Sequence, residues 1–91
     1  MLKRKNIRVS GIVQGVGFRW FVVQHARTFG LVGWTRNNPD GSVEIEAEGT
    51  DDALESLVQE VQRGPRFSRV DSVVNVEIEP LGKEKHFRVV F

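Results

Sequence analysis

The residues best suited to chemistry lie in one glycine-containing stretch, Val13-Gln14-Gly15-Val16-Gly17-Phe18-Arg19. An alternating segment, residues 7–13, precedes the loop and a helical pattern follows it, which predicts a strand, a tight loop and the start of a helix. Gly15 and Gly17 can take positive φ, and they carry no side chain that would keep a ligand away from the backbone amides. Successive N–H groups can then point into one concavity and bind an anion there.

The helix expected after this loop starts without the usual N-terminal groups. Its first turn holds no Asp or Glu, and no Ser, Thr, Asn or Asp lies just before it to cap the free amides. Arg19 lies at the positive end of the helix dipole, where a cation should cost about 0.3–1 kcal/mol. A phosphate from outside would supply the missing negative charge, because an arginine and several amides can share its oxygens. On the loop alone, a plain glycine turn with a surface arginine remains an equally good interpretation.

Hydrophobic periodicity predicts the elements that position this loop. We expect strands over residues 7–13, 31–38, 42–48, 70–79 and 86–91, and helices over residues 18–29 and 51–63. Pro39-Asp40-Gly41 predicts the turn of a hairpin between the second and third strands. The order βαββαβ, with a short extra C-terminal strand, is typical of an α+β, ferredoxin-like sandwich. Such a fold has a mainly antiparallel sheet with both helices on one face.

Several finer expectations follow from the alternation of residues along these strands. Gly11, inside the first strand, indicates that another part of the protein packs close against it. We expect Trp34 to pack within the sheet. Trp20, next to Arg19, is expected to pack as well, with a place in the wall of the site as the alternative. In the strand expected over residues 70–79, alternation predicts an apolar face formed by Val70, Val74, Val76 and Ile78. In the strand expected over residues 42–48, it predicts a solvated acidic ridge formed by Glu44, Glu46 and Glu48.

Length and composition narrow the class of protein. The 91 residues fit one domain, residues 1–91, and the absence of cysteine leaves neither disulfides nor thiolate metal sites. No run approaches the roughly 20 apolar residues that cross a bilayer, so we expect a cytoplasmic protein with no membrane partner. The net charge is +1, but residues 1–40 carry seven Lys or Arg and one acid, Asp40. An anionic ligand should therefore meet the first half of the chain, unless the two halves neutralise each other across the fold.

Three segments together resemble the acylphosphatase family: V-Q-G-V-G-F-R at 13–19, G-W-T-R-N at 33–37 and D-G-S-V-E at 40–44. The resemblance extends over essentially the whole chain. It implies a hydrolase of carboxyl-phosphate bonds that needs no metal and no cofactor. It also implies that Arg19 and the loop residues Gln14, Gly15, Val16, Gly17 and Phe18 bind the phosphate, and that Asn37 holds the attacking water. The implied partners are a small acyl phosphate and inorganic phosphate, with no nucleic acid, and we expect a monomer.

The residue types are compatible with this chemistry. The motif region has no Cys, Lys or Asp to form a covalent intermediate, so direct attack by water is the simpler course. The carboxamide of Asn37 does not titrate in the useful range, but it can orient one water molecule. An acyl phosphate releases a carboxylate, whose conjugate acid has a pKa of about 4 and which leaves without a general acid. A site with Arg19 and Asn37 but no acid therefore suits acyl phosphates better than ordinary phosphate esters.

Two other functions fit the same order of elements. An RNA-binding module would stack bases on aromatic residues of its central strands, but residues 7–13 and 42–48 contain none, and three glutamates in the second would repel phosphate. A non-catalytic anion-sensing domain would use Arg19 and the loop amides, but it would have little need for a water-orienting Asn37. Hydrolysis of acyl phosphates is therefore the favoured function.

Overall fold

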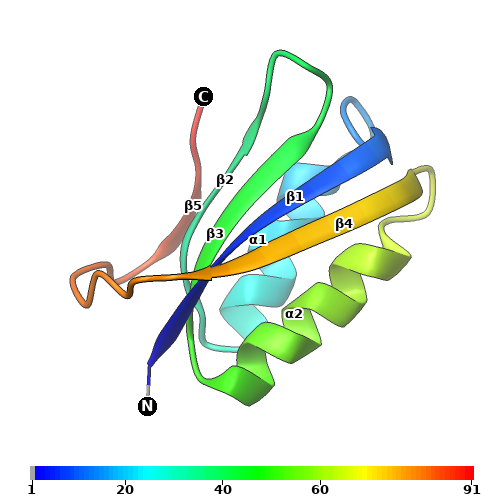
Figure 1. Ribbon diagram of the computed structural model, residues 1–91. Helices are drawn as coiled ribbons and strands as arrows, with labels where there is room; N and C mark the ends of the chain where they lie inside the picture. The colour runs from blue at the N-terminus through cyan, green and yellow to red at the C-terminus, as the bar shows by residue number, and fades with distance from the viewer. Residues whose placement is uncertain (1) are drawn as a thin grey trace.

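The computed structural model describes residues 2–91 as one sheet covered on one face by two helices (Figure 1). The elements in chain order are β1 (Lys3–Ile12), α1 (Phe18–Thr28), β2 (Val32–Asn37), β3 (Val43–Gly49), α2 (Asp51–Arg63), β4 (Arg69–Ile78) and β5 (Phe87–Val89). The strand order is β4-β1-β3-β2-β5. All pairings are antiparallel except that of β2 with β5. The predicted ferredoxin-like fold with an added short strand is thus confirmed.

The hydrophobic core fills the space between the helices and the sheet. The helices supply Phe18, Val22 and Ala26 from α1, and Leu54, Leu57 and Val61 from α2. The sheet supplies alternate residues of β1 and β3, among them Ile7, Val9, Val43 and Ile45, which are fully buried. This core fixes the first turn of α1, because Phe18 is itself only 1% exposed.

A β-bulge changes which side chains of β4 face the core. The pairing of β1 with β4 shifts between Ser10 and Gly11, where Gly11 has φ +132°. A Cβ on Gly11 would lie 2.1 Å from the carbonyl oxygen of Arg69, so the expected close approach is confirmed. At this point β4 has one residue more than β1, and beyond it the side chains of β4 that would face the helices face the opposite side of the sheet.

The expected apolar face of β4 is therefore wrong. Val70 packs against the core together with Val73, whereas Val74 and Val76 lie on the open face and are 60% and 57% exposed. Simple alternation along residues 70–78 cannot anticipate this result, because the reversal comes from the pairing of Gly11 in another strand.

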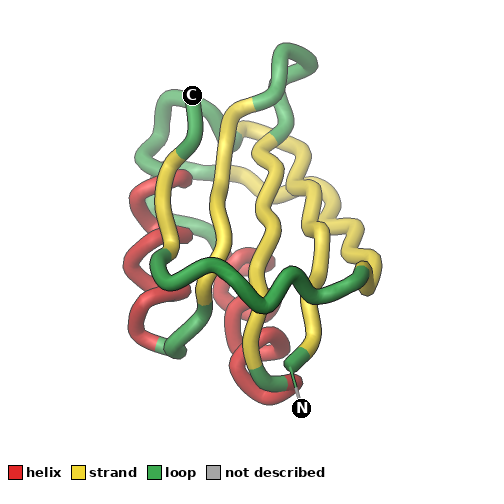
Figure 2. Tube along the Cα trace, turned by 90° about the vertical axis from the view of Figure 1, so that its left-hand side faces the viewer, coloured by secondary structure: helices red, strands yellow, loops and turns green. Residues whose placement is uncertain are grey.

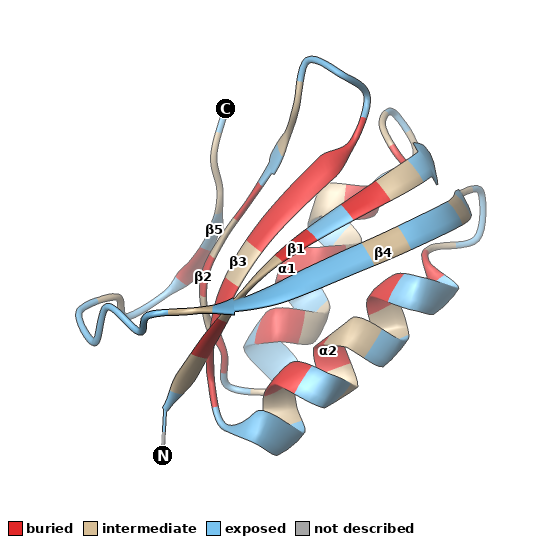
Figure 3. Ribbon diagram, in the orientation of Figure 1, coloured by how far each residue is buried: buried red, intermediate tan, exposed pale blue. Residues whose placement is uncertain are grey.

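The acidic residues of β3 do not form a solvated ridge. The segment that joins β4 to β5 crosses the face of the sheet opposite the helices (Figure 2). Most residues of β3 are buried (Figure 3). Glu48 is 3% exposed and accepts hydrogen bonds from the amides of Leu81 (2.7 Å) and Gly82 (3.0 Å). Arg4, 1% exposed, contacts Glu48 at 3.2 Å.

The same arginine joins two further carboxylates to this network. Its Nε donates to Glu46 at 2.9 Å, and its Nη1 donates to Glu84 of the crossing segment. Because a buried charge is tolerated only with partners, these contacts hold the segment of residues 79–86 on the sheet. They thereby fix where β5 begins.

Glu48→Gln tests this network. Burial alone would raise the pKa of Glu48, but hydrogen bonds from Leu81 and Gly82, and the Arg4 guanidinium, outweigh it and hold the pKa below its ordinary value. A carboxyl whose pKa is lowered by folding adds stability above its unfolded pKa of about 4, and this stability is lost as the pH falls through the folded value. We expect the variant to lose about 1–3 kcal/mol of unfolding free energy at pH 7.

The difference between wild type and Glu48→Gln should shrink as the pH is lowered below about 4. Urea unfolding at several pH values measures it. Glu79→Gln, which changes an exposed carboxylate outside the network, is the control. A difference that stays constant with pH would contradict the assignment.

Candidate active site

The loop between β1 and α1 has the backbone conformation that its two glycines permit. Gly15 has φ +75° and Gly17 has φ +78°, both in the left-handed region. A Cβ added to either residue would meet no atom within 4 Å. The glycines are therefore required by backbone conformation and not by crowding within the protein, and the space beside them is open to a ligand.

Helix α1 begins at this loop with its amides free. Gly17 is its N-cap, no side chain caps the helix, and its first turn holds no acidic residue. Among the hydrogen bonds found within residues 2–91, none has the amide of Gly15 through Trp20 as donor. In contrast, Thr50 Oγ1 caps α2 by accepting from the Ala53 amide at 3.2 Å. The start of α1 therefore offers several donors and a positive dipole end to an anion.

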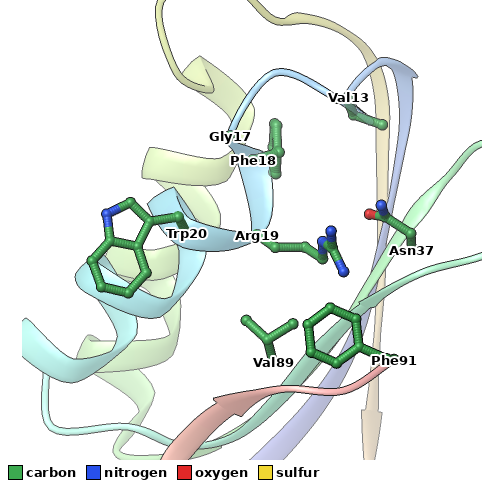
Figure 4. A pocket seen from close by; sticks show the side chains of 9 residues that line it. Val13, Gly17, Phe18, Arg19, Trp20, Asn37, Val89 and Phe91 are labelled. Atoms are coloured by element: carbon green, nitrogen blue, oxygen red, sulfur yellow. The ribbon is translucent and has the colours of Figure 1, made fainter.

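Arg19 projects from the first turn of α1 toward Asn37, which lies at the end of β2 (Figure 4). Over residues 2–91 the Arg19 side chain forms no ion pair or hydrogen bond with another residue. Its guanidinium carbon lies 5.2 Å from the centre of the Phe91 ring, which is a cation–π contact. The hydrogen-bond donors of Arg19 are thus available to a ligand.

Asn37 faces the same space. Its Oδ1 is buried and has no hydrogen-bond partner within the described chain. A buried acceptor without a partner is unusual in a folded protein, and the residue that carries this one lines a pocket of about 240 Å³. The pocket is lined by Val13, Gly15, Gly17, Phe18, Arg19, Trp20, Asn37, Val89 and Phe91.

Gln14 connects the loop to the hairpin that carries Asn37. Its Nε2 donates to the carbonyl oxygens of Asn38 (2.8 Å) and Ser42 (3.0 Å). The hairpin turn is also held from within, since the Ser42 amide and hydroxyl both donate to Asp40, at 2.9 and 2.7 Å. These bonds from the Ser42 hydroxyl and amide hold the pKa of Asp40 below its ordinary value, so the turn keeps its charge-assisted bonds at neutral pH.

The structure brings together most of the residues expected at the site. Gly15, Gly17, Phe18, Arg19 and Asn37 line one pocket, although Asn37 is 18 residues from Arg19 in the sequence. The other two loop residues do not line it: the side chain of Gln14 is turned to the hairpin, and Val16 packs against the core. Phe18 holds the end of the loop against the core, because its ring is buried there.

Three lining residues have places that differ from the sequence expectation or were not anticipated. For Trp20 packing was favoured over a place in the wall of the site, but the residue is 59% exposed and lines the pocket, as the alternative expected. Val89 and Phe91 reach the pocket because β5 pairs in parallel with β2, opposite Gly33, Trp34 and Thr35. Alternation in residues 86–91 predicts a strand, but it carries no signal for which strand it joins.

A mixed sheet with two helices on one face, and a glycine loop that leaves the amides at the start of the first helix free, defines a small ferredoxin-like α+β domain. A family model described as Acylphosphatase matches residues 5–89, and the chain belongs to this family. It is 47% identical to an acylphosphatase of Chlorobaculum tepidum over 97% of this chain and 96% of that protein. It is 56% identical to one of Bifidobacterium longum over 79% and 74% of the two chains.

The fold agrees with a solved structure of the family. The crystal structure of acylphosphatase from Bacillus subtilis superposes with a TM-score of 0.94 at 44% identity, and it covers 100% of both chains. The order of elements predicted from periodicity is therefore that of a known member of the family.

Replacing Gln14 tests whether its side chain joins the loop to the hairpin. Gln14→Ala removes both hydrogen bonds to the carbonyls of Asn38 and Ser42, and we expect a loss of about 1–2 kcal/mol of unfolding free energy. Amide hydrogen exchange within residues 38–42 should become faster. Gln24→Ala, on the exposed face of α1, is the matched control and should leave that exchange unchanged. Unchanged exchange in Gln14→Ala would show that the tether does not hold the turn.

Proposed function

We propose that this protein hydrolyses the carboxyl-phosphate bond of small acyl phosphates and releases a carboxylate and inorganic phosphate. Membership of the acylphosphatase family supports the activity. The single observation that carries its assignment to this pocket is the unpaired Arg19 guanidinium, which faces the unpaired Oδ1 of Asn37 across it. A donor for phosphate and an acceptor for water are thus held on two separate elements that line one pocket.

In the proposed mechanism the phosphate lies in the loop. The amides of Gln14 to Phe18 and the Arg19 guanidinium donate to its non-bridging oxygens. Because these donors are fixed by backbone conformation and core packing, little reorganisation is needed as charge develops on the transferring phosphoryl group. Arg19 and Asn37 are the proposed catalytic residues, and no metal ligand is assigned.

Asn37 orients the nucleophile. Its Oδ1 accepts a hydrogen bond from one water, and the water oxygen attacks phosphorus on the side opposite the carboxylate. The new P–O bond forms as the bond from phosphorus to the acyl oxygen breaks, and the electron pair of that bond leaves with the carboxylate. The proton of the attacking water passes to a phosphoryl oxygen of the substrate, because Asn37 itself does not titrate.

This arrangement also selects the reaction. Within residues 2–91 the pocket is lined by no Asp, Glu, His or Lys, so none of its side chains can protonate an alkoxide leaving group. A carboxylate needs no protonation, since its conjugate acid has a pKa of about 4. We therefore propose acyl phosphates and not phosphate monoesters as the substrates.

We further propose that the chain works as one domain, as a cytoplasmic monomer, and without nucleic acid. The sheet face that an RNA-binding module would use is crossed here by the segment of residues 79–86 and carries Glu44 and Glu46 (Figure 2). Within residues 2–91 no helix is long and apolar enough to span a membrane. A purely anion-sensing role is disfavoured because anion binding needs Arg19 and the loop amides but not the water-orienting carboxamide of Asn37.

The direct test is phosphate release from acetyl phosphate by the purified chain in excess EDTA. We expect turnover under these conditions, and little or no release from p-nitrophenyl phosphate. Loss of activity in EDTA, restored by a divalent metal, would overturn the metal-free mechanism. Tight phosphate binding without turnover would favour the anion-sensing alternative.

Arg19→Ala should remove most of the activity, by about 10²–10³-fold in kcat, because the strongest donor to the transferring oxygens is lost. Inorganic phosphate should also inhibit much more weakly, since the same guanidinium binds it. Arg19→Lys retains the charge without the planar fork and should recover only part of the activity. Arg66→Ala, an exposed arginine outside the pocket, is the control. Full activity in Arg19→Ala would refute the assigned site.

Asn37→Ala should separate catalysis from binding. We expect kcat to fall by about 10²-fold, because positioning of the water is lost. Inhibition by inorganic phosphate should remain within about threefold of wild type, because the loop and Arg19 are intact. Asn75→Ala on the exposed edge strand β4 is the matched control. An equal loss of turnover and phosphate binding would place Asn37 in the phosphate site instead.

A further inference from the structure

A second pocket lies at the C-terminal end of α1, away from the proposed active site. It has a volume of about 300 Å³ and is bordered by Arg27 in the last turn of the helix, by residues 30–32 that lead into β2, and by residues 85–87 that lead into β5. The eight residue steps from Arg19 to Arg27 correspond to about 12 Å along the helix axis. No residue lines both pockets, so the two are separate sites.

The ionisable side chains that border this second pocket are all basic. They are Arg27, Lys85 and His86. Over residues 2–91 no Asp or Glu lines the pocket, and none of the three basic side chains forms an ion pair. Glu84, the acidic neighbour of Lys85 in the sequence, is already paired with Arg4. A pocket lined by one sign of charge raises the local concentration of ions of the opposite sign.

Arg27 is held in place by the backbone of another element. Its Nη2 donates to the carbonyl oxygen of Phe87, the first residue of β5, at 3.1 Å. The other N–H groups of this guanidinium have no hydrogen-bond partner within residues 2–91. A guanidinium presents five donors in a planar fork that matches phosphate and carboxylate oxygens. Because one donor already fixes the side chain, less conformational freedom is lost when the others bind an anion.

The backbone at this helix end is arranged so that it does not repel an anion. Free carbonyls at a helix C-terminus carry partial negative charge. Here the amide of Leu31 donates to the carbonyl of Ala26 at 2.8 Å, and the amide of Gly30 donates to that of Arg27 at 3.1 Å. The helix dipole alone would explain one basic residue in the last turn, but it does not explain the two that come from the segment before β5.

We propose that Arg27, Lys85 and His86 form a second anion-binding site, for a small ligand with at least two negative charges on phosphate or carboxylate oxygens. The two cationic side chains each pair with one charge, and the ring of His86 supplies an N–H donor in either protonation state. A volume of about 300 Å³ is at the lower end for small-molecule pockets, which suits a ligand of the size of diphosphate or citrate. The site is independent of the proposed hydrolysis.

Two-dimensional ¹H–¹⁵N NMR of the protein tests this site, with diphosphate and citrate as the probes. At least one of the two ions should shift the amide signals of residues 27–32 and 85–87, with a Kd of about 1 mM or lower. A response to diphosphate alone would assign the site to phosphate groups, and a response to citrate alone to carboxylates. The signals of residues 14–20 report separately on the loop before α1, so failure of the proposed function would leave this measurement valid.

Arg27→Gln/Lys85→Gln should weaken this binding by about tenfold or more, because two charge-assisted contacts are lost. The matched control is Arg66→Gln/Lys83→Gln, which removes two exposed positive charges outside the pocket and changes the net charge equally. It should leave the Kd within about twofold of the wild type, because charges outside the pocket are screened by salt.

Lys85→Gln alone should raise the Kd by about threefold or more, and it tests the site without removing the bond from Arg27 to Phe87. Absence of shifts at residues 27–32 and 85–87 with both probes would overturn the inference. Equal weakening in the two double variants would also overturn it, because the effect would then come from net charge and not from a site.

Discussion

The site depends on one positive charge that the fold leaves without a partner. Arg4 and Arg19 show the contrast: Arg4 is 1% exposed and meets Glu46, Glu48 and Glu84, whereas Arg19 has no ion pair within residues 2–91. Arg19 also stands at the positive end of α1, beside uncapped amides. The positive end of the helix dipole, the free amides and the guanidinium repel one another electrostatically. An anion placed among them attracts all three. In the proposed function, the phosphoryl group is the anion that pairs with this charge.

The sheet topology explains how distant segments of the chain meet there. Strand β3 lies between β1 and β2, so the loop after β1 and Asn37 at the end of β2 lie on strands that are not neighbours. The Gln14 side chain spans this separation by bonding to Asn38 and Ser42. On the other side of the pocket, β5 joins β2 in parallel and brings Val89 beside Thr35. The Arg4 network holds the preceding segment on the sheet, so the outer wall of the pocket depends on contacts far from the chemistry.

Local pattern was sufficient for the elements and for the loop, because helix stripes, strand alternation and turn residues are properties of short segments. It predicted the free start of α1 and the close approach at Gly11. It failed where a second segment decides the outcome. Alternation could not place Val70 on the core face, because the bulge depends on the pairing of β4 with Gly11. It could not bury Glu48, because the amides of Leu81 and Gly82 come from a segment without regular structure. Nor could it bring Phe91 to Arg19, which requires the choice of β2 as the partner of β5.

The two helix starts differ in whether their backbone amides have hydrogen-bond partners within the protein, and this difference separates a structural helix end from the candidate site. Helix α2 has its own cap at Thr50 and two acidic residues in its first turn, so its start needs nothing from outside. Helix α1 lacks both, but the buried Phe18 ring and the left-handed Gly17 keep its first turn in place without them. The donors at this turn are consequently held rigid while they are still unpaired. Preorganised donors of this kind favour a transferring phosphoryl group more than water could, because the protein has already met the free-energy cost of orienting them during folding.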